Sequence, residues 1–299
     1  MEFKKGLVSI VIPTYGRCDY LHRSIDSVLN QTYKNIEIIV VDDNGIDTEQ
    51  GQKTSEVMSK YADESRVFYK QHKFNKNGSA ARNTGIALSA GEFIAFLDDD
   101  DEFTNDKIES QVKTLLRNAG YGGIYCLHDK FFKGKHLSTS EYSKIGDCQY
   151  DVFSLQSDIH TSSLLLYSDI VRELAGFDAE FRRHQDFEFL IRFFENYKIM
   201  CIKESLLIIN IESEINRPNV DKLISAKRIF FDKLKVILDS YPVEKKKNIY
   251  KAHNIELFRV CLKRLDFRFL KYLLLAKPGI NDFKVYMLPV IKKYLKKGF

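Results

Sequence analysis

The sequence predicts an α/β fold, with a mostly parallel sheet covered by helices on both faces and a helical C-terminal extension. In the first hundred residues, short apolar runs rich in β-branched residues alternate with segments of helical period. Each run stops at Pro, at Asp or at turn residues, as buried parallel strands do. From about residue 222 the period is helical, with Lys and Arg on the polar faces. This order implies right-handed crossovers between neighbouring parallel strands.

The first half supplies the clearest elements. The run 7–12 (LVSIVI) ends at Pro13, and the run 36–41 (IEIIVV) ends at two aspartates. Segment 19–30 carries its apolar residues on one helical stripe. The expected strands are 7–12, 36–41, 66–70 and 93–97, and the expected helices are 19–30, 47–62 and 79–90.

After residue 101 the pattern loosens. We expect helices at 105–118 and 186–196 and strands at 123–133 and 160–167. Arg217-Pro218-Asn219 interrupts the pattern, which places a domain boundary near 215–220. The chain should therefore divide into 1–217 and a basic helical region at 218–299.

Composition limits the class of protein. The 299 residues include 46 basic and 41 acidic ones, but residues 222–299 carry a local charge of +14 and the rest −9. With 44% hydrophobic and 29% charged residues the chain is globular rather than disordered. No apolar run reaches the roughly 18 residues of a membrane span, and the start has no signal-peptide pattern. Five widely spaced cysteines argue against a disulfide framework or zinc site and favour a reduced, cytoplasmic location.

The clearest strands end in polar residues that should meet at one edge of the sheet. One of these ends is Asp98 to Asp101, four consecutive aspartates. Neighbouring carboxylates repel unless water or a cation neutralises them, and oxygen ligands suit Mg²⁺ or Mn²⁺. The alternative is a solvated acidic loop. An EF-hand does not fit, because Phe103 stands where its loop needs Gly, and neither a dinucleotide nor a P-loop motif occurs.

Four stretches together carry a resemblance to family 2 glycosyltransferases, which have the GT-A fold. They are VSIVIPTYGR (8–17), SIDSVLNQTYKNIEIIVVDD (24–43), GSAARNTGI (78–86) and GEFIAFLDDDD (91–101). The resemblance covers roughly residues 7–210. It implies a nucleotide-diphosphate sugar donor, usually a uridine one, a divalent metal, and inversion at the anomeric carbon. Residues 1–101 would bind the nucleotide, and 102–217 the acceptor.

The resemblance also assigns residues. Asp43 would hold the base, and Asp98 and Asp99 would reach ribose or sugar hydroxyls, while Arg82 could equally be a surface arginine of its helix. The implied donor-binding residues are Pro13, Thr14, Tyr15, Arg17, Asp43, Arg82, Asp98 and Asp99. The Asp-x-Asp motif falls on Asp98 and Asp100, with Asp100 as the main metal ligand. Four aspartates in a row blur the assignment between neighbours.

The implied catalytic base is Asp186, preceded by Gln185 where the family usually has Glu. Asp186 could instead only cap the helix that starts there. His160 and His184 are candidates for the acceptor side, although a lone His is more often structural. One metal and one base suffice for a single in-line displacement, because the attacking hydroxyl must lose its proton.

The sequence identifies neither the sugar nor the acceptor, which we expect to be a saccharide or a lipid-linked one in cell-surface polysaccharide synthesis. A sugar nucleotidyltransferase and a non-catalytic sugar-nucleotide-binding module remain as alternatives. The basic region 222–299 predicts contact with an anionic membrane on the cytoplasmic side, and 282–299 has the composition of an interfacial helix. A packed helical subdomain with solvated lysines is the competing interpretation. No motif indicates nucleic-acid binding.

Overall fold

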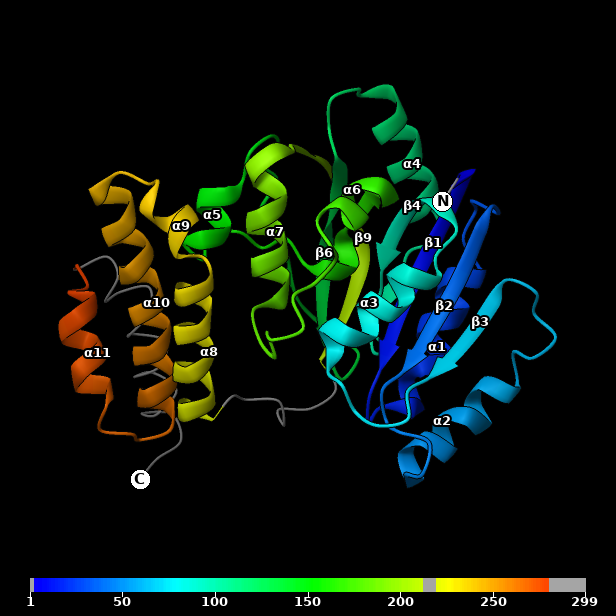
Figure 1. The fold of residues 1–299 in the computed structure, drawn as a ribbon, viewed down its shortest axis with the longest axis horizontal. Helices are drawn as coiled ribbons and strands as arrows, with labels where there is room; N and C mark the ends of the chain where they lie inside the picture. The colour runs from blue at the N-terminus through cyan, green and yellow to red at the C-terminus, as the bar shows by residue number, and fades with distance from the viewer. Residues whose placement is uncertain (1–2, 212–218, 280–299) are drawn as a thin grey trace. The chain divides into compact units, whose positions relative to one another are not determined.

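The computed structural model describes residues 3–211 and 219–279, and the chain forms two compact units (Figure 1). The first, called the sheet unit below, comprises Met1–Gln149 and Ser157–Glu214. The second, called the helical unit, comprises Tyr150–Gln156 and Ile215–Phe299. The segment Tyr150–Gln156 therefore belongs with the C-terminal helices, although it comes from the middle of the chain.

Within the described residues, a nine-stranded sheet forms the centre of the sheet unit. Its strands are β1 (Lys4–Thr14), β2 (Ile36–Asp42), β3 (Val67–Gln71), β4 (Gly91–Phe96), β5 (Glu102–Phe103), β6 (Gly123–Phe132), β7 (Lys135–Thr139), β8 (Leu165–Tyr167) and β9 (Ile199–Ile211). Their order is β3-β2-β1-β4-β8-β6-β9-β5, and β7 pairs with β6.

The direction of the strands follows from their pairings. The strands β1 to β4 run parallel to their neighbours. Strand β8 is antiparallel to both β4 and β6, so β6 and its parallel partner β9 run in the same direction as β4. The reversed strands are β5, β7 and β8. The mostly parallel α/β fold predicted from the sequence is confirmed.

Helices cover both faces of this sheet, as Figure 1 shows. They are α1 (Cys18–Leu29), α2 (Glu49–Ser59), α3 (Gly78–Leu88), α4 (Lys107–Arg117), α6 (Ser168–Glu173) and α7 (Gln185–Asn196). On β1, the alternate residues Val8, Ile10 and Ile12 share one core cluster with α1 and α4. Val11 points the other way, towards α3. There a side chain at Gly85 would come within 2.3 Å of Val11, so this glycine lets α3 lie close on the sheet.

One predicted element is shorter than expected. Only Leu165–Tyr167 of the predicted strand 160–167 is a strand, and Thr161–Ser163 forms a 3₁₀ turn that starts after His160. The hydroxyl of Ser163 donates to the carbonyl of His160 at 2.6 Å, and the backbone N–H of Ser162 donates to the His160 ring at 3.3 Å. Such local bonds compete with strand pairing.

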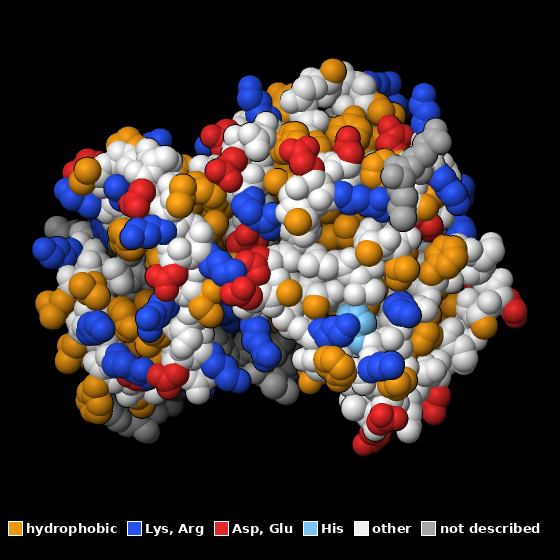
Figure 2. All heavy atoms as spheres, viewed as in Figure 1, with side chains coloured by type: hydrophobic (Ala, Val, Ile, Leu, Met, Phe, Trp, Pro, Cys, Tyr) orange, Lys and Arg blue, Asp and Glu red, His pale blue; other side chains and the backbone are white. Residues whose placement is uncertain are grey.

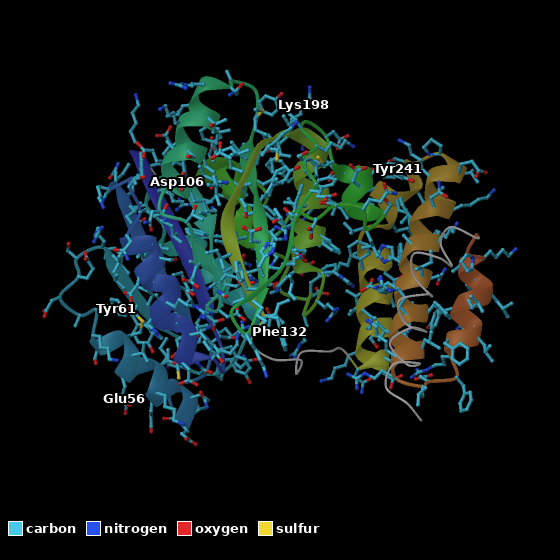
Figure 3. The ribbon with its side chains drawn as sticks, turned by 180° about the vertical axis from the view of Figure 1, so that it is seen from behind. Glu56, Tyr61, Asp106, Phe132, Lys198 and Tyr241 are labelled. Atoms are coloured by element: carbon cyan, nitrogen blue, oxygen red, sulfur yellow. The ribbon has the colours of Figure 1, made fainter. Side chains whose placement is uncertain are left out.

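The helical unit contains the described helices of the predicted extension. They are α8 (Val220–Lys233), α9 (Lys235–Asp239), α10 (Val243–Lys263) and α11 (Phe269–Ala276). The short helix α5 (Gln149–Phe153) brings Phe153 against the rings of Phe230 and Tyr241, at 5.5 and 6.0 Å between centroids. Figure 3 labels Tyr241 among the side chains of the helical unit. The predicted interfacial helix 282–299, and most of the predicted boundary at 215–220, lie outside the described residues.

Two expectations from composition can be compared with the structure. Among residues 3–211 and 219–279, no helix combines the length and apolar character that crossing a bilayer requires. All five cysteines lie in described parts of the chain, and they are free and buried.

Candidate active site

A pocket of about 400 Å³ lies where β1, β2 and β4 end. Its lining is Pro13, Thr14, Tyr15, Arg17, Asp43, Asn75, Asn77, Gly78, Ala81, Arg82, Asp98, Arg182 and Gln185. Every residue predicted to contact the donor is in this set except Asp99. The fold therefore brings together side chains that are up to 172 positions apart in the chain, from Pro13 to Gln185.

Asp99 lies beneath the pocket rather than on its surface, since it is 0% exposed. Its carboxylate accepts a hydrogen bond from the backbone N–H of Tyr15 at 3.3 Å and pairs with Arg17 at 2.6 Å. Burial raises the pKa of Asp99 to about 7, and the charge of Arg17 opposes that rise. Asp99 thus holds the loop between β1 and α1 in place.

Asp100, predicted as the main metal ligand, forms an ion pair with the other guanidinium nitrogen of Arg17. Burial raises the pKa of Asp100, with Arg17 again opposing. Arg23 donates to the backbone carbonyl of Asp100 at 2.7 Å. Arg17 therefore neutralises Asp99 and Asp100 together.

Arg82 is buried, not a surface arginine: its exposed fraction is 6%. Its guanidinium donates to Asp98 at 2.6 Å and lies 5.5 Å from the centre of the Phe177 ring. Burial alone would raise the pKa of Asp98, but Arg82, His160 and Arg17 outweigh it and lower that pKa. Asp98 is thus kept ionised at the wall of the pocket.

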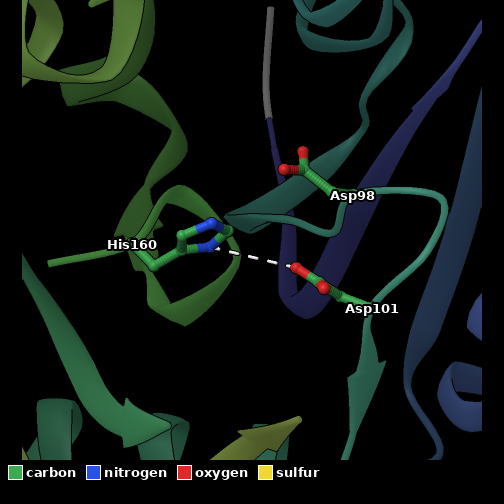
Figure 4. A group of neighbouring side chains, drawn as sticks. All are labelled: Asp98, Asp101 and His160. Atoms are coloured by element: carbon green, nitrogen blue, oxygen red, sulfur yellow. Dashed lines mark ion pairs between the residues drawn. The ribbon is translucent and has the colours of Figure 1, made fainter. Parts of the chain in front are cut away.

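Asp98, Asp101 and His160 offer ligand atoms that all lie within 4.8 Å of one another (Figure 4). The ring of His160 is 4.0 Å from the Asp101 carboxylate. Burial, together with repulsion from Asp98 and Asp100, raises the pKa of Asp101 well above its usual range. Two carboxylates and an imidazole at this spacing fit a divalent cation, and the set suits Mn²⁺ better than an all-oxygen ion such as Mg²⁺.

Asp43 lines the pocket, but its carboxylate is already well occupied. One oxygen accepts from the ring of His72 at 2.7 Å and the backbone N–H of Lys76 at 2.8 Å. The other accepts from the side chain of Asn75 and the backbone N–H of Asn77, both at 2.8 Å. A carboxylate has about four acceptor positions, so Asp43 fixes the loop 72–77 that forms one wall of the pocket.

Helix α7 carries the predicted base near its start. Asp186 is the second residue of α7, where the helix dipole favours negative charge. Burial raises its pKa, while the nearby charges of His160 and Arg82 oppose that rise. Gln185 lines the pocket and accepts from the hydroxyl of Ser79 at 2.5 Å, which ties α7 to α3.

His184, predicted for the acceptor side, precedes α7 with a left-handed backbone at φ 61°. Its ring stacks on Phe187 at 5.4 Å between centroids, and it is 8% exposed. The residue therefore sets the direction in which α7, and with it Asp186, enters the site.

Sequence reasoning missed several pocket residues, among them Asn75, Asn77 and Arg182. Asn77 carried a readable signal: it precedes Gly78, and its side chain caps α3 by accepting from the backbone N–H of Ala80 at 3.1 Å. Arg182 comes from an irregular loop and carried no such signal. Asp101 was part of the acidic run, but no pattern distinguished its role from that of its neighbours.

Residues 9–164 match the family model described as glycosyl transferase family 2, and the chain belongs to that family. The resemblance seen in the sequence is confirmed. The amylovoran biosynthesis glycosyltransferase AmsB of Erwinia amylovora is 28% identical over 290 residues, covering 92% of this chain and 93% of that protein. An uncharacterized glycosyltransferase of Methanocaldococcus jannaschii is 30% identical over 234 residues, covering 75% and 78%.

Solved structures support the same fold. The S. aureus TarS 1–349 complex with UDP-GlcNAc superimposes with a TM-score of 0.58 at 12% identity, over 96% of this chain and 92% of that one. In a longer TarS structure, this chain spans 54% of the length. At such low identity the likeness shows the GT-A fold alone.

Proposed function

We propose that this chain transfers a sugar from a nucleotide-diphosphate donor, a uridine one, to a hydroxyl of a saccharide or lipid-linked acceptor, with inversion. The observation that carries the proposal is one pocket that joins the ends of β1, β2 and β4 to the acidic group of Asp98, Asp101 and His160. A nucleotide needs such a pocket, and a diphosphate leaving group needs positive charge beside it.

In this proposal the nucleoside lies between the loop after β1 and the loop 72–77. Pro13, Thr14 and Tyr15 contribute one wall, and the ring of Tyr15 is 60% exposed and so accessible for stacking. An N–H of the nucleotide's base would donate to the Asp43 carboxylate. It would share an acceptor position with one of the four protein donors described above. A solved structure of TarS, which has a similar fold, contains UDP-GlcNAc. This supports a uridine-diphosphate sugar as the donor in the proposed pocket.

A divalent metal, Mn²⁺ or Mg²⁺, would be held by Asp98 with Asp101 and His160, and Asp100 remains a proposed further ligand. When bound, such an ion supplies positive charge that stabilises the departing diphosphate. Arg17 and Arg182 line the same pocket and would add cationic contacts to the phosphates.

Asp186 would accept the proton of the attacking acceptor hydroxyl. Burial raises its pKa, which makes the ionised carboxylate a stronger base once it has lost its proton. Because this proposal assigns Asp98, Asp100 and Asp101 to the metal and Asp43 to the nucleotide's base, it leaves no carboxylate for a covalent nucleophile and favours a single displacement with inversion.

The relative AmsB is named for amylovoran biosynthesis, which supports a role in building a polysaccharide. A hexosyl group would be the unit transferred. An acceptor carried on a lipid would bring the enzyme to the inner face of the cell membrane.

A panel of radiolabelled sugar nucleotides, incubated with the full chain and no acceptor, tests the proposal. We expect slow, Mn²⁺-dependent hydrolysis of one UDP-sugar, with UDP as the product, because water can replace the acceptor. In a parallel reaction with added pyrophosphate, formation of UTP and a sugar 1-phosphate from the UDP-sugar would instead indicate a nucleotidyltransferase. If no sugar nucleotide bound to the protein, both the proposed glycosyltransferase and the alternative nucleotidyltransferase would be contradicted. Full activity in excess chelator would contradict the requirement for a divalent metal.

A further inference from the structure

The end of α10 and the outer side of α11 expose an unusual number of large apolar side chains. They are Leu265 (74% exposed), Phe267 (85%), Leu270 (53%), Leu274 (73%) and Leu275 (55%). Single exposed leucines are ordinary on a protein surface, but a cluster of five within eleven residues is not. These five residues are called the apolar turn below.

Helix α11 is apolar on two sides. Tyr272 and Ala276, four residues apart, are both buried, and Tyr272 belongs to the core cluster of the helical unit. Leu270 and Leu274, also four residues apart, form a second stripe that faces solvent. A helix that is apolar beyond the face it packs with needs a second apolar environment.

The backbone of the turn presents these side chains at a fixed place. Arg268 pairs with Asp266 at 2.6 Å and also with Asp221 of α8, which ties the turn to the helical unit. Leu265 adopts a left-handed conformation at φ 55°, which is unfavourable for a branched side chain. Leu265 takes this conformation in the turn that ends α10, where its N–H donates to the carbonyl of Leu262 at 3.1 Å and the N–H of Asp266 donates to Cys261 at 3.0 Å.

Basic residues surround the apolar turn. Between residues 259 and 277 the chain has six Lys and Arg and a single Asp. Lys263, Arg264, Lys271 and Lys277 are exposed. Figure 2 shows hydrophobic and basic side chains interspersed over α11, at the left edge of the view.

We infer that the apolar turn inserts into the interface of an anionic membrane, with the surrounding Lys and Arg contacting lipid headgroups. Apolar side chains amid basic ones are the composition of interfacial segments, whose lysines extend their stems along apolar surface towards the headgroups. A second copy of this chain fits less well, because a symmetric pairing would place like charges opposite one another. Nucleic acid would use the charges but not the leucines.

This surface differs from the segment 282–299 that the sequence suggested, since it lies within described residues. The inference does not depend on the proposed sugar transfer. A vesicle-binding measurement therefore tests it even if no donor is found.

The test is flotation of the full chain with phosphatidylglycerol-containing and pure phosphatidylcholine vesicles at low and high salt. We expect the unaltered protein to float with the anionic vesicles at low salt. The double variant Phe267→Ser, Leu274→Ser should lose about tenfold in partitioning, because two large apolar side chains no longer enter the interface.

The matched control is Val236→Ser with Val243→Ser, which are 85% and 63% exposed. These residues lie at or before the start of α10, whereas the apolar turn follows its end, about 30 Å away along 21 residues. The control should float like the unaltered protein, and circular dichroism should show both variants folded.

Four outcomes would overturn the inference. If the Phe267/Leu274 variant floated as well as the unaltered protein, the apolar turn would not be the membrane-binding surface. The same would follow if the Val236/Val243 control lost as much flotation as the Phe267/Leu274 variant. Loss of flotation only on truncation after Asp282 would assign binding to the last residues of the chain. Dimerisation that the Phe267/Leu274 variant abolishes, without vesicle binding, would make the turn a contact between copies.

Discussion

The two units depart from ordinary globular packing in opposite ways. The sheet unit buries charge: Asp99, Asp101, Arg82 and Lys107 are all less than 7% exposed. The helical unit exposes apolar residues, with Phe267 at 85%. Burying an ion costs several kcal/mol unless it is compensated, and exposing large apolar groups forgoes their burial. In the proposals above, the buried aspartates and Arg82 would serve a donor and a metal, and the exposed apolar side chains would serve a membrane surface.

The described residues of the helical unit also include a buried lysine, whose charge is compensated differently. Lys227 is 3% exposed and pairs with Glu256 at 2.5 Å. In the sheet unit, Lys107 donates to the neutral amide of Gln111 at 2.7 Å and lies 3.9 Å from the centre of the Phe103 ring. The comparison therefore predicts different consequences when each charge is removed.

The largest effect should come from Asp186→Asn. We expect transfer to fall by about a thousandfold or more, because the acceptor hydroxyl loses its base, while donor affinity stays within about twofold. Single-turnover transfer and titration of the donor analogue UDP measure the two quantities. The control is Glu195→Gln, an exposed residue on the same helix.

Asn also serves well at a helix start, so this variant separates the two interpretations of Asp186. Retained transfer with little change in Tm would leave Asp186 only a structural role in the first turn of α7, after the N-cap position at His184. The Asp186 carboxylate would then have a structural role in the sheet unit and no catalytic one.

The next effect concerns the metal. Asp98 belongs both to the group in Figure 4 and to the predicted Asp98–Asp100 pair. We expect Asp98→Asn to lower Mn²⁺-dependent turnover by a few hundredfold, on the scale of losing a ligand. Asp101→Asn should weaken Mn²⁺ binding more than Asp100→Asn, because Arg17 already neutralises Asp100. Manganese titration followed by electron paramagnetic resonance measures this, and the reverse order would make Asp100 the main ligand.

Sequence reasoning predicted most of the residues that line the candidate pocket together, but not their individual contacts. Strands that end in Pro13, in two aspartates and in an acidic run predicted one edge of the sheet, because parallel strands share their direction. The sequence could not predict which aspartate lies nearest the candidate metal site. That depends on a turn in which the N–H of Asp101 donates to the carbonyl of Asp98 at 3.1 Å. That turn directs Asp101 towards His160 and leaves Asp100 with Arg17.

Contacts between residues far apart in the chain could not be predicted from the sequence for a similar reason. The segment Tyr150–Gln156 joins the helical unit partly because the ring of His253 donates to the carbonyl of Phe153 at 2.9 Å. The two residues are 100 positions apart, and neither carries a local pattern that indicates its partner. The apolar turn was overlooked because its leucines follow a helical period that normally indicates a core.

The third effect is on stability in the sheet unit. Burial lowers the pKa of Lys107 to about 8. Between that value and the ordinary pKa near 10.4, the unfolded chain binds a proton that the folded chain does not, so stability should rise with pH in this window. The rise amounts to about 3 kcal/mol, and Lys107→Met should abolish it. Urea unfolding at several pH values measures the effect.

The exposed Lys113 on the same helix provides the matched control for that measurement. Lys113→Met should leave the pH dependence unchanged. An identical rise in Lys107→Met would show that another group, not the buried lysine, titrates in this window.

The smallest effect is expected from Lys227→Met in the helical unit. Removing one member of a buried ion pair leaves Glu256 without its cation, and also removes the donor that meets the ring of His253 at 2.7 Å. Because the Glu256 side chain is 29% exposed, water recovers part of the loss, and we expect a destabilisation of about 1 to 2 kcal/mol. Lys222→Met, at an exposed position of α8, is the control. In the double variant Lys227→Met, Glu256→Gln the second change should add little, because no uncompensated carboxylate remains. Additive losses would instead mean that the two side chains stabilise the unit independently, and that this buried lysine resembles Lys107 after all.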